Sequence, residues 1–244
     1  MKNVAFIPAR YGSSRFEGKP LALIAGRPMI QHVYERAASC RSLDGLYVAT
    51  DDQRIFDCVV QFGGHAIMTD GRHRSGTDRI AEASDTVNLA DNDIVVNIQG
   101  DQPLLPPASI SELIAPLIED PALPMSTLMY RIQDEQEVSN TNHVKVVVDN
   151  NGCALYFSRL PIPFHRDRPS KPSYFKHLGI YAYRKHFLTV FTKLPYGHLE
   201  HREKLEQLRA LEHGYTIRVV ETLLDSREVD TPEDIKAIEE MLAA

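Results

Sequence analysis

The chain has 244 residues, of which 43% are hydrophobic, and a formal net charge of −6. This length and composition suit one large packed domain and disfavour intrinsic disorder. The acidic balance argues against general binding to nucleic acid or to membrane surfaces, both of which favour a basic face. We therefore expect no nucleic-acid partner and no membrane partner, and any anion-binding site must be a local concentration of positive charge.

The amino terminus begins with a strand pattern instead of a charged-then-apolar leader, and no apolar run approaches the roughly 18 residues that span a bilayer. The cysteines Cys40, Cys58 and Cys153 are far apart, odd in number and without metal-ligand spacing. This usage fits a reducing compartment better than a disulfide framework. We expect a cytoplasmic protein with structural cysteines.

Short apolar runs with β-branched character predict the strands. In chain order they are Val4–Ile7, Leu46–Ala49, Ala66–Met68, Ile94–Ile98, Ser126–Tyr130, Val144–Val148, Ala154–Phe157, Ile180–Tyr183 and Ile217–Val220. Helical patterns separate the early runs: one covers Met29–Ala37, and another begins at the capping-box-like Ser75–Asp78 and continues to Val87. Strand alternating with helix predicts a doubly wound parallel sheet for residues 1–120.

After about residue 121 strand follows strand, and Asn150–Gly152 predicts a hairpin turn between two of them. The proline-rich stretch Pro161–Pro172 predicts an irregular loop that could form an arm or a lid. Helices return over His201–His213, and a final helix begins at Asp230–Asp234, where an early proline and acidic residues favour initiation. The change of rhythm predicts a small antiparallel subdomain.

The first predicted strand runs into a loop that carries Arg10, Arg15 and Lys19 among small residues. A loop at the carboxyl end of a strand can aim backbone N–H groups and cations at one point, as a triphosphate requires. It is not a P-loop, because its glycines are one residue too far apart and Pro20, which follows Lys19, has no hydroxyl for a metal ion. The alternative is a solvated basic turn.

Two carboxylates from distant segments are candidate metal ligands. Asp101 lies just past the run Ile94–Ile98, where a doubly wound sheet places its ligand crevice, and Asp230 begins the last helix. Hard oxygen ligands of this kind can share Mg²⁺. The alternatives are a turn residue for Asp101 and a helix cap for Asp230.

Eight motifs occur in order along nearly the whole chain: Ile7–Leu21, Val48–Asp52, Ser75–Arg79, Val96–Pro103, Ala154–Arg159, Lys176–Tyr181, Leu205–Arg209 and Val229–Asp234. Together they resemble the CMP-KDO synthetases, the 3-deoxy-manno-octulosonate cytidylyltransferases. The resemblance implies a nucleotide-diphospho-sugar transferase-like α/β fold with a doubly wound mixed sheet. It also implies Mg²⁺-dependent transfer of CMP from CTP to the anomeric hydroxyl of a 2-keto-3-deoxy sugar acid, with release of pyrophosphate, for lipopolysaccharide biosynthesis.

The resemblance also implies roles for single residues. The catalytic positions are Arg15, Lys19, Asp101 and Asp230, and the last two are the metal ligands. The nucleotide-binding positions are Pro8, Ala9, Arg10, Ser14, Arg15, Lys19, Ser75, Gly76 and Arg79. The sugar-binding positions are Gln99, Arg159, His177, Tyr181, Glu206 and Gln207. Taken singly, Ser75 is also an ordinary helix cap, His177 a packed histidine and Glu206 part of a solvated helix face.

The family forms homodimers, and we expect a single domain over residues 1–244 in which residues 121–185 form a sugar-binding and dimerisation subdomain. One departure concerns specificity: many CMP-KDO synthetases carry Glu where this chain has Gln102, and His143 also differs from the commoner pattern. Some relatives with this glutamine activate 8-amino-3,8-dideoxy-manno-octulosonate instead, so both sugars stay open.

Two other functions are weighed against cytidylyl transfer. A glycosyltransferase of similar fold would carry an Asp-x-Asp motif at a strand end, but Asp91 and Asp93 precede their strand. A non-catalytic nucleotide sensor would be favoured by loss of Lys19, Asp101 or Asp230, and all three are present.

Overall fold

The computed structural model describes residues 1–12, 16–166 and 173–243. Contacts divide the chain into two compact units: unit 1 comprises Met1–Ser111 and Ser226–Ala244, and unit 2 comprises Glu112–Asp225. Helix α4 (Pro107–Glu119) crosses the boundary along the sequence. Unit 2 covers more of the chain than the segment 121–185, for which we predict sugar binding and dimerisation. Those two roles stay predictions.

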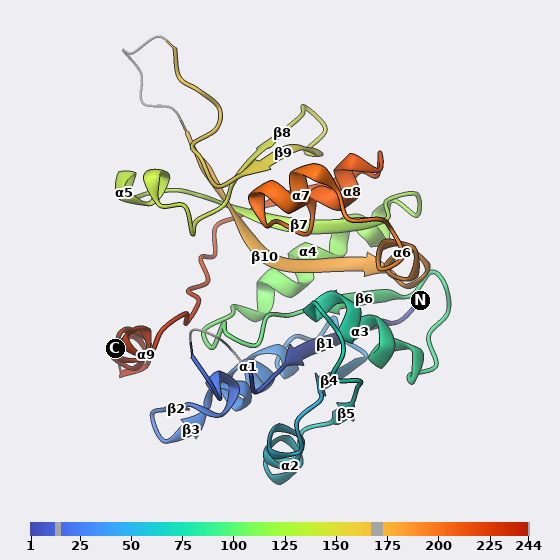
Figure 1. Ribbon diagram of the computed structural model, residues 1–244, viewed down its shortest axis with the longest axis vertical. Helices are drawn as coiled ribbons and strands as arrows, with labels where there is room; N and C mark the ends of the chain where they lie inside the picture. Colours follow the sequence, from blue (N-terminus) through green and yellow to red (C-terminus); the bar gives the residue numbers. More distant parts are fainter. Residues whose placement is uncertain (13–15, 167–172, 244) are drawn as a thin grey trace. The chain divides into compact units, whose positions relative to one another are not determined.

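Unit 1 contains a parallel sheet with the strand order β5-β4-β1-β6 (Figure 1). The strands are β1 (Asn3–Ala9), β4 (Gly45–Thr50), β5 (Ala66–Met68) and β6 (Ile94–Asn97). From β1 the chain first builds outward through β4 and β5 and then returns to the other side of β1 for β6. Because the direction of winding reverses there, the carboxyl ends of β1 and β6 border the crevice in which doubly wound sheets bind ligands.

The other elements of unit 1 are α1 (Met29–Ala38), α2 (Gln53–Gln61), α3 (Gly76–Asp85), α9 (Pro232–Ala243), the 3₁₀ turn η1 (Lys19–Leu21) and a small hairpin of β2 (Leu23–Ile24) and β3 (Arg27–Pro28). Residues 4–7 of β1 are all buried, as a central strand with both faces covered requires. The last helix joins this unit through Val229 and Ile238, which pack with Ile24 and Met29. This packing places the carboxyl-terminal segment beside the residues that follow the predicted phosphate loop.

Unit 2 contains β7 (Met125–Arg131), β8 (Lys145–Val148), β9 (Ala154–Ser158), β10 (Phe175–Arg184) and β11 (Ile217–Thr222). Strand β7 pairs antiparallel with β10 and parallel with β11, and β8 pairs antiparallel with both β9 and β10. Its helices are α5 (Glu135–Ser139), α6 (Lys185–Phe191), α7 (His198–Glu203) and α8 (Leu208–Glu212). The predicted hairpin turn is confirmed: Gly152 has a φ of 73° and its N–H donates to the carbonyl of Asp149.

All the predicted strands are present, and so are the parallel sheet of the first half and the antiparallel pairing after residue 121. The helices predicted over His201–His213 are present as α7 and α8, and Lys204 adopts a left-handed φ of 55° that ends α7. One helix prediction needs correction. Helix α3 ends at Asp85 and does not reach Val87, since Thr86 turns its hydroxyl back to the carbonyl of Ala83.

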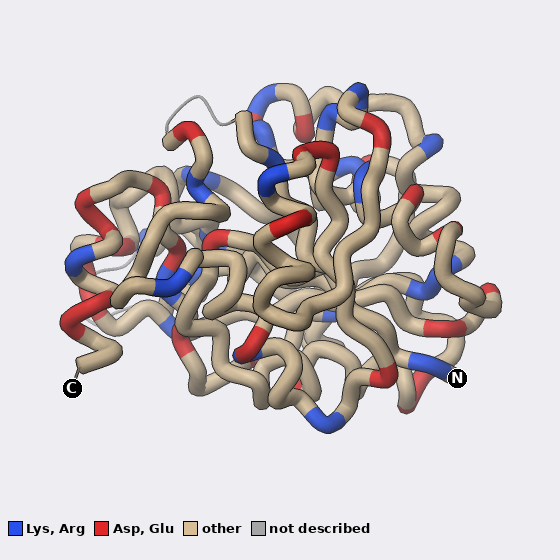
Figure 2. Tube along the Cα trace, turned by 90° about the horizontal axis from the view of Figure 1, so that it is seen from below, with Lys and Arg blue, Asp and Glu red and all other residues tan. Residues whose placement is uncertain are grey.

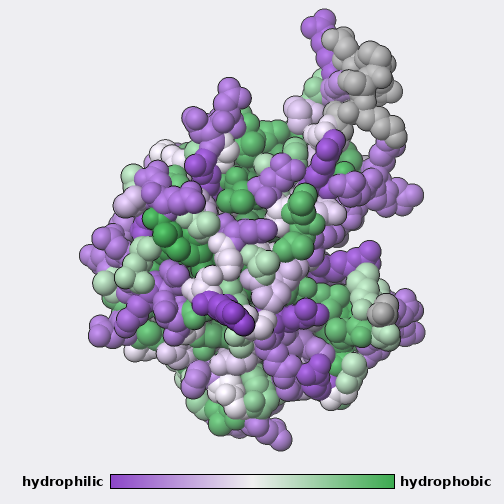
Figure 3. All heavy atoms as spheres, turned by 180° about the vertical axis from the view of Figure 1, so that it is seen from behind, coloured by the Kyte–Doolittle hydropathy of each residue, from purple (hydrophilic) through white to green (hydrophobic). Residues whose placement is uncertain are grey.

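The charges follow the pattern expected from the composition. In Figure 2 acidic and basic residues are interspersed along the trace. The face drawn in Figure 3 likewise mixes hydrophilic residues with small hydrophobic groups. No helix in the described ranges is long and apolar enough to cross a membrane. Cys40, Cys58 and Cys153 are free thiols, as expected of structural cysteines.

Candidate active site

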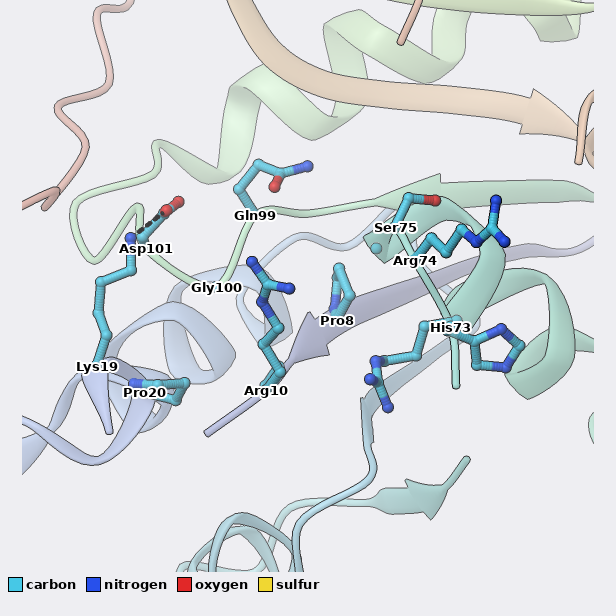
Figure 4. Close-up of a pocket in the computed structure, with 13 residues that line it drawn as sticks. Pro8, Arg10, Lys19, Pro20, His73, Arg74, Ser75, Gln99, Gly100 and Asp101 are labelled. Atoms are coloured by element: carbon cyan, nitrogen blue, oxygen red, sulfur yellow. Dashed lines mark hydrogen bonds and ion pairs between the residues drawn. The ribbon is translucent and has the colours of Figure 1, made fainter. Parts of the chain in front are cut away.

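A pocket of about 310 Å³ lies within unit 1 at the carboxyl ends of β1 and β6 (Figure 4). Its lining residues come from the end of β1, the turn η1, the start of α3 with the loop before it, and the loop after β6. They are Pro8, Ala9, Arg10, Lys19, Pro20, His73, Arg74, Ser75, Gly76, Arg79, Gln99, Gly100 and Asp101. The pocket therefore gathers most of the predicted nucleotide-binding residues, together with Gln99 and Asp101.

The predicted phosphate loop is only partly described. Ser14 and Arg15 lie outside the described residues, so their predicted roles stay predictions. The rest of the loop closes on itself: Gly18 has a φ of 70°, and its N–H donates to the carbonyl of Tyr11. A Cβ on Gly18 would meet the Tyr11 ring at 3.1 Å. This tight turn brings Lys19 to one side of the pocket. Ser75, from the loop expected to recognise the base, lies on the opposite side (Figure 4).

Lys19 contacts both of the segments that carry the predicted metal ligands, the loop after β6 and the residues before α9. Its Nζ atom lies 2.6 Å from Oδ2 of Asp101 and 2.9 Å from the carbonyl oxygen of Val229. The N–H of Val229 in turn donates to the carbonyl of Asp101 at 2.9 Å. These bonds fasten residues 229–230, from the end of the chain, to the loop after β6, so the segments of Asp101 and Asp230 meet as predicted.

The donor set at Asp101 and Asp230 fits Mg²⁺. The Asp101 side chain keeps 26% of its surface exposed, and Asp230 is half-buried, so both can offer oxygen atoms while the ion retains water. Asp234, in the first turn of α9, holds the start of the helix, since its carboxylate accepts from the N–H groups of Asp230 and Thr231. In the described part of the chain no group of three or more His, Cys, Asp or Glu is arranged to hold a metal ion. A two-carboxylate site completed by substrate oxygen atoms is the arrangement that these residues allow.

Two glycines shape the floor of the pocket. A Cβ on Gly76 would meet Cγ of Pro8 at 3.0 Å, and a Cβ on Gly100 would meet the carbonyl oxygen of Pro8 at 3.2 Å. Glycine therefore lets the end of β1 and the two neighbouring loops approach each other closely. Ser75 is both a pocket residue and a helix cap, since its Oγ accepts from the N–H of Asp78 at 3.1 Å.

Arg79 lines the pocket but serves largely to hold it together. The side chain is nearly buried, donates to Oγ1 of Thr69 at 2.6 Å and pairs with Asp51 at 3.2 Å. These bonds tie α3 to the loops after β4 and β5. Arg10 is exposed, and its guanidinium group extends into the pocket in Figure 4. Of these two predicted nucleotide ligands, Arg10 has the geometry to reach a phosphate.

The sequence reasoning missed the loop before α3. His73 and Arg74 line the pocket, and Glu82 on α3 accepts from the ring Nε2 of His73 and from the N–H of Asp70 at 3.0 Å. Although partial burial acts in the opposite direction, these hydrogen bonds lower the pKa of Glu82. The loop is thus held by an ionised carboxylate. The basic run directly before the Ser75 motif was the signal available in the sequence.

Glu228 is a second residue that the sequence reasoning missed. Its Oε1 accepts from Nε2 of the buried Gln102 at 3.1 Å. Withdrawal from water, reinforced by the carboxylates of Asp101 and Asp230, raises the pKa of Glu228 to about 7. Glu228 therefore adds a carboxylate beside the two predicted metal ligands.

The remaining predicted sugar-binding residues belong to unit 2. Nε2 of His177 lies 2.9 Å from Oγ1 of Thr127, which itself donates to the carbonyl of Ile180 at 2.8 Å. Because the hydroxyl hydrogen is used there, His177 must carry its hydrogen on Nε2 and present Nδ1 as an acceptor. Burial lowers the pKa of His177 to about 3, so the ring is neutral. Its ring lies 5.3 Å from that of Tyr181.

Arg159, Glu206 and Gln207 lie around the junction of α7 and α8. The guanidinium group of Arg159 donates to the carbonyls of Glu203 and Thr141 at 2.7 and 2.9 Å, so it is anchored by protein atoms. Glu206 contacts Arg209 at 3.4 Å. Gln207 is 4% exposed, and its Nε2 has no hydrogen-bond partner among the described residues. A buried donor without a partner is costly unless a ligand satisfies it.

The comparisons with known proteins agree with this geometry. The cytidylyltransferase family profile matches residues 4–223. The chain is 59% identical to a 3-deoxy-manno-octulosonate cytidylyltransferase of Syntrophus aciditrophicus, over 99% of this chain and 97% of that protein. It is 57% identical to an 8-amino-3,8-dideoxy-manno-octulosonate cytidylyltransferase of Shewanella loihica, over 100% of this chain and 99% of that protein.

Among solved structures, CMP:2-keto-3-deoxy-manno-octonic acid synthetase complexed with CTP matches with a TM-score of 0.94 at 46% identity, covering 100% of this chain and 99% of that one. A 4-diphosphocytidyl-2C-methyl-D-erythritol synthase, at 15% identity and a TM-score of 0.65, shares the fold. The mixed α/β architecture predicted from the sequence is confirmed. The chain belongs to the cytidylyltransferase family.

Proposed function

We propose that this protein transfers CMP from CTP to the anomeric hydroxyl of a 3-deoxy-manno-octulosonate, either KDO or 8-amino-3,8-dideoxy-KDO, and releases pyrophosphate. The product would serve lipopolysaccharide biosynthesis. The observation that carries the proposal is the pocket at the carboxyl ends of β1 and β6, where Arg10, Lys19 and Arg74 face the same space as Asp101. Relatives named for each of the two sugars match the whole chain.

In the proposed reaction the sugar hydroxyl oxygen forms a bond to the α-phosphorus of CTP, the bond from that phosphorus to the pyrophosphate oxygen breaks, and the hydroxyl proton leaves. Arg10, Arg74 and Lys19 would stabilise the negative charge of the leaving pyrophosphate. Arg15 is expected to contribute to the same task. The carboxylates of Asp101 and Asp230 would hold Mg²⁺, which polarises the phosphate and lowers the pKa of the attacking hydroxyl when it is bound.

Base recognition is assigned to the loop from Ser75 to Arg79 and to the backbone near Pro8 and Ala9. The close approach at Gly76 and Gly100 supports this assignment, because it exposes backbone groups at the pocket floor. The sugar acid is assigned to Gln99 and to the unit 2 residues. Nε2 of Gln207 has no hydrogen-bond partner among the described residues and could donate to a sugar hydroxyl, and Nδ1 of His177 could accept from one.

We also propose a homodimer and a cytoplasmic location. The three free thiols support a reducing compartment. Sedimentation equilibrium over a range of protein concentrations tests the dimer, and a monomer at all concentrations would reject it.

The test of the reaction is pyrophosphate release with CTP and Mg²⁺, with KDO and its 8-amino analogue compared side by side. Release with either sugar supports the transfer, and the ratio of the two kcat/KM values identifies the substrate. Asp230→Ala is the matched control: we expect a cooperatively folding protein with almost no release. Absence of release with both sugars from the unaltered enzyme would reject the proposal.

A further inference from the structure

Gln102, which is buried, and Glu228, which is exposed, form a pairing next to the two carboxylates assigned to Mg²⁺. Gln102 directly follows Asp101, and Glu228 precedes Asp230 by two residues. Nε2 of Gln102 donates to Oε1 of Glu228 at 3.1 Å, across 126 residues of sequence. The hydrogen bond therefore joins the two segments that supply the metal ligands.

In this hydrogen bond the NH₂ group of Gln102 faces Glu228, whose Oε1 accepts. Gln102 is 1% exposed, and its Oε1 has no hydrogen-bond partner among the described residues. Burial of Oε1 without a hydrogen-bond partner costs folding free energy. The cost would be offset by a donor next to Asp101, such as a water molecule.

Hydrogen bonds and packing hold the backbone around the pair in place. The N–H of Val229 donates to the carbonyl of Asp101, and Nζ of Lys19 donates to the carbonyl of Val229. Val229 itself is fully buried and packs against Ile24 and Met29. The peptide of residues 228–230 therefore cannot move away from Asp101 without breaking these contacts, and the carboxylate of Glu228 is held at a fixed place beside them.

We propose that Glu228 is a positioning residue for the Mg²⁺ of the reaction: its side chain, held by Gln102 beside the segments of Asp101 and Asp230, would favour binding of the ion by these two carboxylates. The proposal rests on the function proposed above. Glu228 acts here through its charge and its hydrogen bond, since the described residues include no ready group of three ligands. The two side chains are nearly equal in shape, so the charge can be moved from one to the other.

The test is a double-mutant cycle. Glu228→Gln keeps the shape and an acceptor but removes the charge, and Gln102→Glu places two carboxylates against each other. The double variant Gln102→Glu/Glu228→Gln restores one charge and one hydrogen bond with the direction reversed. Glu240→Gln, an exposed glutamate on α9, is the matched control. The readouts are the Mg²⁺ concentration at half-maximal pyrophosphate release and the Mg²⁺-induced shift of the melting temperature.

For Glu228→Gln we expect the half-saturating Mg²⁺ concentration to rise about tenfold while kcat at saturating Mg²⁺ changes less, as for other groups that orient a metal ion. Gln102→Glu should melt at a lower temperature without Mg²⁺, because two adjacent carboxylates repel. In the double variant the half-saturating Mg²⁺ concentration should return to within about twofold of that of the unaltered enzyme. The Mg²⁺-induced shift of its melting temperature should return in the same way, as for other coupled pairs.

The proposal is overturned by an unchanged Mg²⁺ requirement in Glu228→Gln, or by a double variant no better than the worse single one. An unaltered enzyme whose melting temperature does not respond to Mg²⁺ would also overturn it. The melting readout needs no sugar, so it tests the pair even if neither sugar supports pyrophosphate release. Failure of the pair and failure of the proposed reaction are therefore distinguishable.

Discussion

Nζ of Lys19 lies 2.6 Å from Oδ2 of Asp101, so the cation assigned to phosphate binding is paired with a carboxylate assigned to the metal ion. Both side chains are largely but not fully buried, with 16% and 26% of their surfaces exposed. The pair neutralises charge in a pocket that otherwise gathers groups of both signs. Lys19 thus lines the pocket while it is held by the carboxylate, and we propose that it contacts a phosphate of CTP from this place.

Lys19→Ala should reduce kcat/KM for CTP by about 10²- to 10³-fold, because a charge that stabilises the leaving pyrophosphate is lost. Steady-state kinetics of pyrophosphate release measure this. The variant should still unfold cooperatively, since the pair borders the solvent. Arg27→Ala, which removes the exposed ion pair with Glu35, is the control and should keep full activity. Loss of cooperative melting in Lys19→Ala would contradict this assignment.

Gly100→Ala should raise the KM for CTP about tenfold. The added Cβ would lie 3.2 Å from the carbonyl oxygen of Pro8, so the loop after β6 must shift away from the end of β1. Gly71→Ala is the control, because its Cβ would meet Asp51 only at an ordinary 3.4 Å. Isothermal titration with CTP checks both variants. Equal affinities in the two would show that the close approach is unimportant.

Glu82→Ala should weaken CTP binding several-fold, because His73 and the N–H of Asp70 lose their common acceptor and the loop before α3 loosens. We expect a larger change in KM than in kcat, since the loop is proposed to contact the nucleotide equally in the ground state and the transition state. Asp57→Asn, which alters an exposed contact to Gln53, is the control. A fall in kcat with unchanged KM would argue against this role.

His177 should make stability depend on pH. Its pKa in the folded protein is lowered to about 3, whereas an unfolded histidine titrates near 6.5. The unfolded chain therefore takes up a proton that the folded chain refuses, and the contribution is present above pH 6.5 and lost as the pH falls toward 3. His177→Gln should flatten the free energy of unfolding between pH 6.5 and 4, measured by urea denaturation. The same slope in both proteins would refute the buried neutral ring.

The strands and the site motifs could be predicted because their signals are local. Apolar runs such as Ile94–Ile98 identify buried strands whatever their partners are, and the Ser75–Asp78 start identifies a cap that the structure contains. Helices were predicted over His201–His213, but the left-handed turn at Lys204 that separates α7 from α8 has no signal in the composition. The role of Arg79 could not be predicted either, since no local pattern shows that its side chain contacts Asp51 and Thr69.

By itself the sequence determined the strand pattern, because residue type and spacing carry it, and through its resemblance to a known family it also identified Lys19, Asp101 and Asp230 as candidate site residues. Only the tertiary structure decided which side chains share an environment. The pairing of Gln102 with Glu228 and the bracing of His73 by Glu82 depend on atoms that meet only after folding. Hydrogen bonds and charge effects act over a few ångströms, and the chain brings residues 126 positions apart within that range through packing that no local pattern encodes.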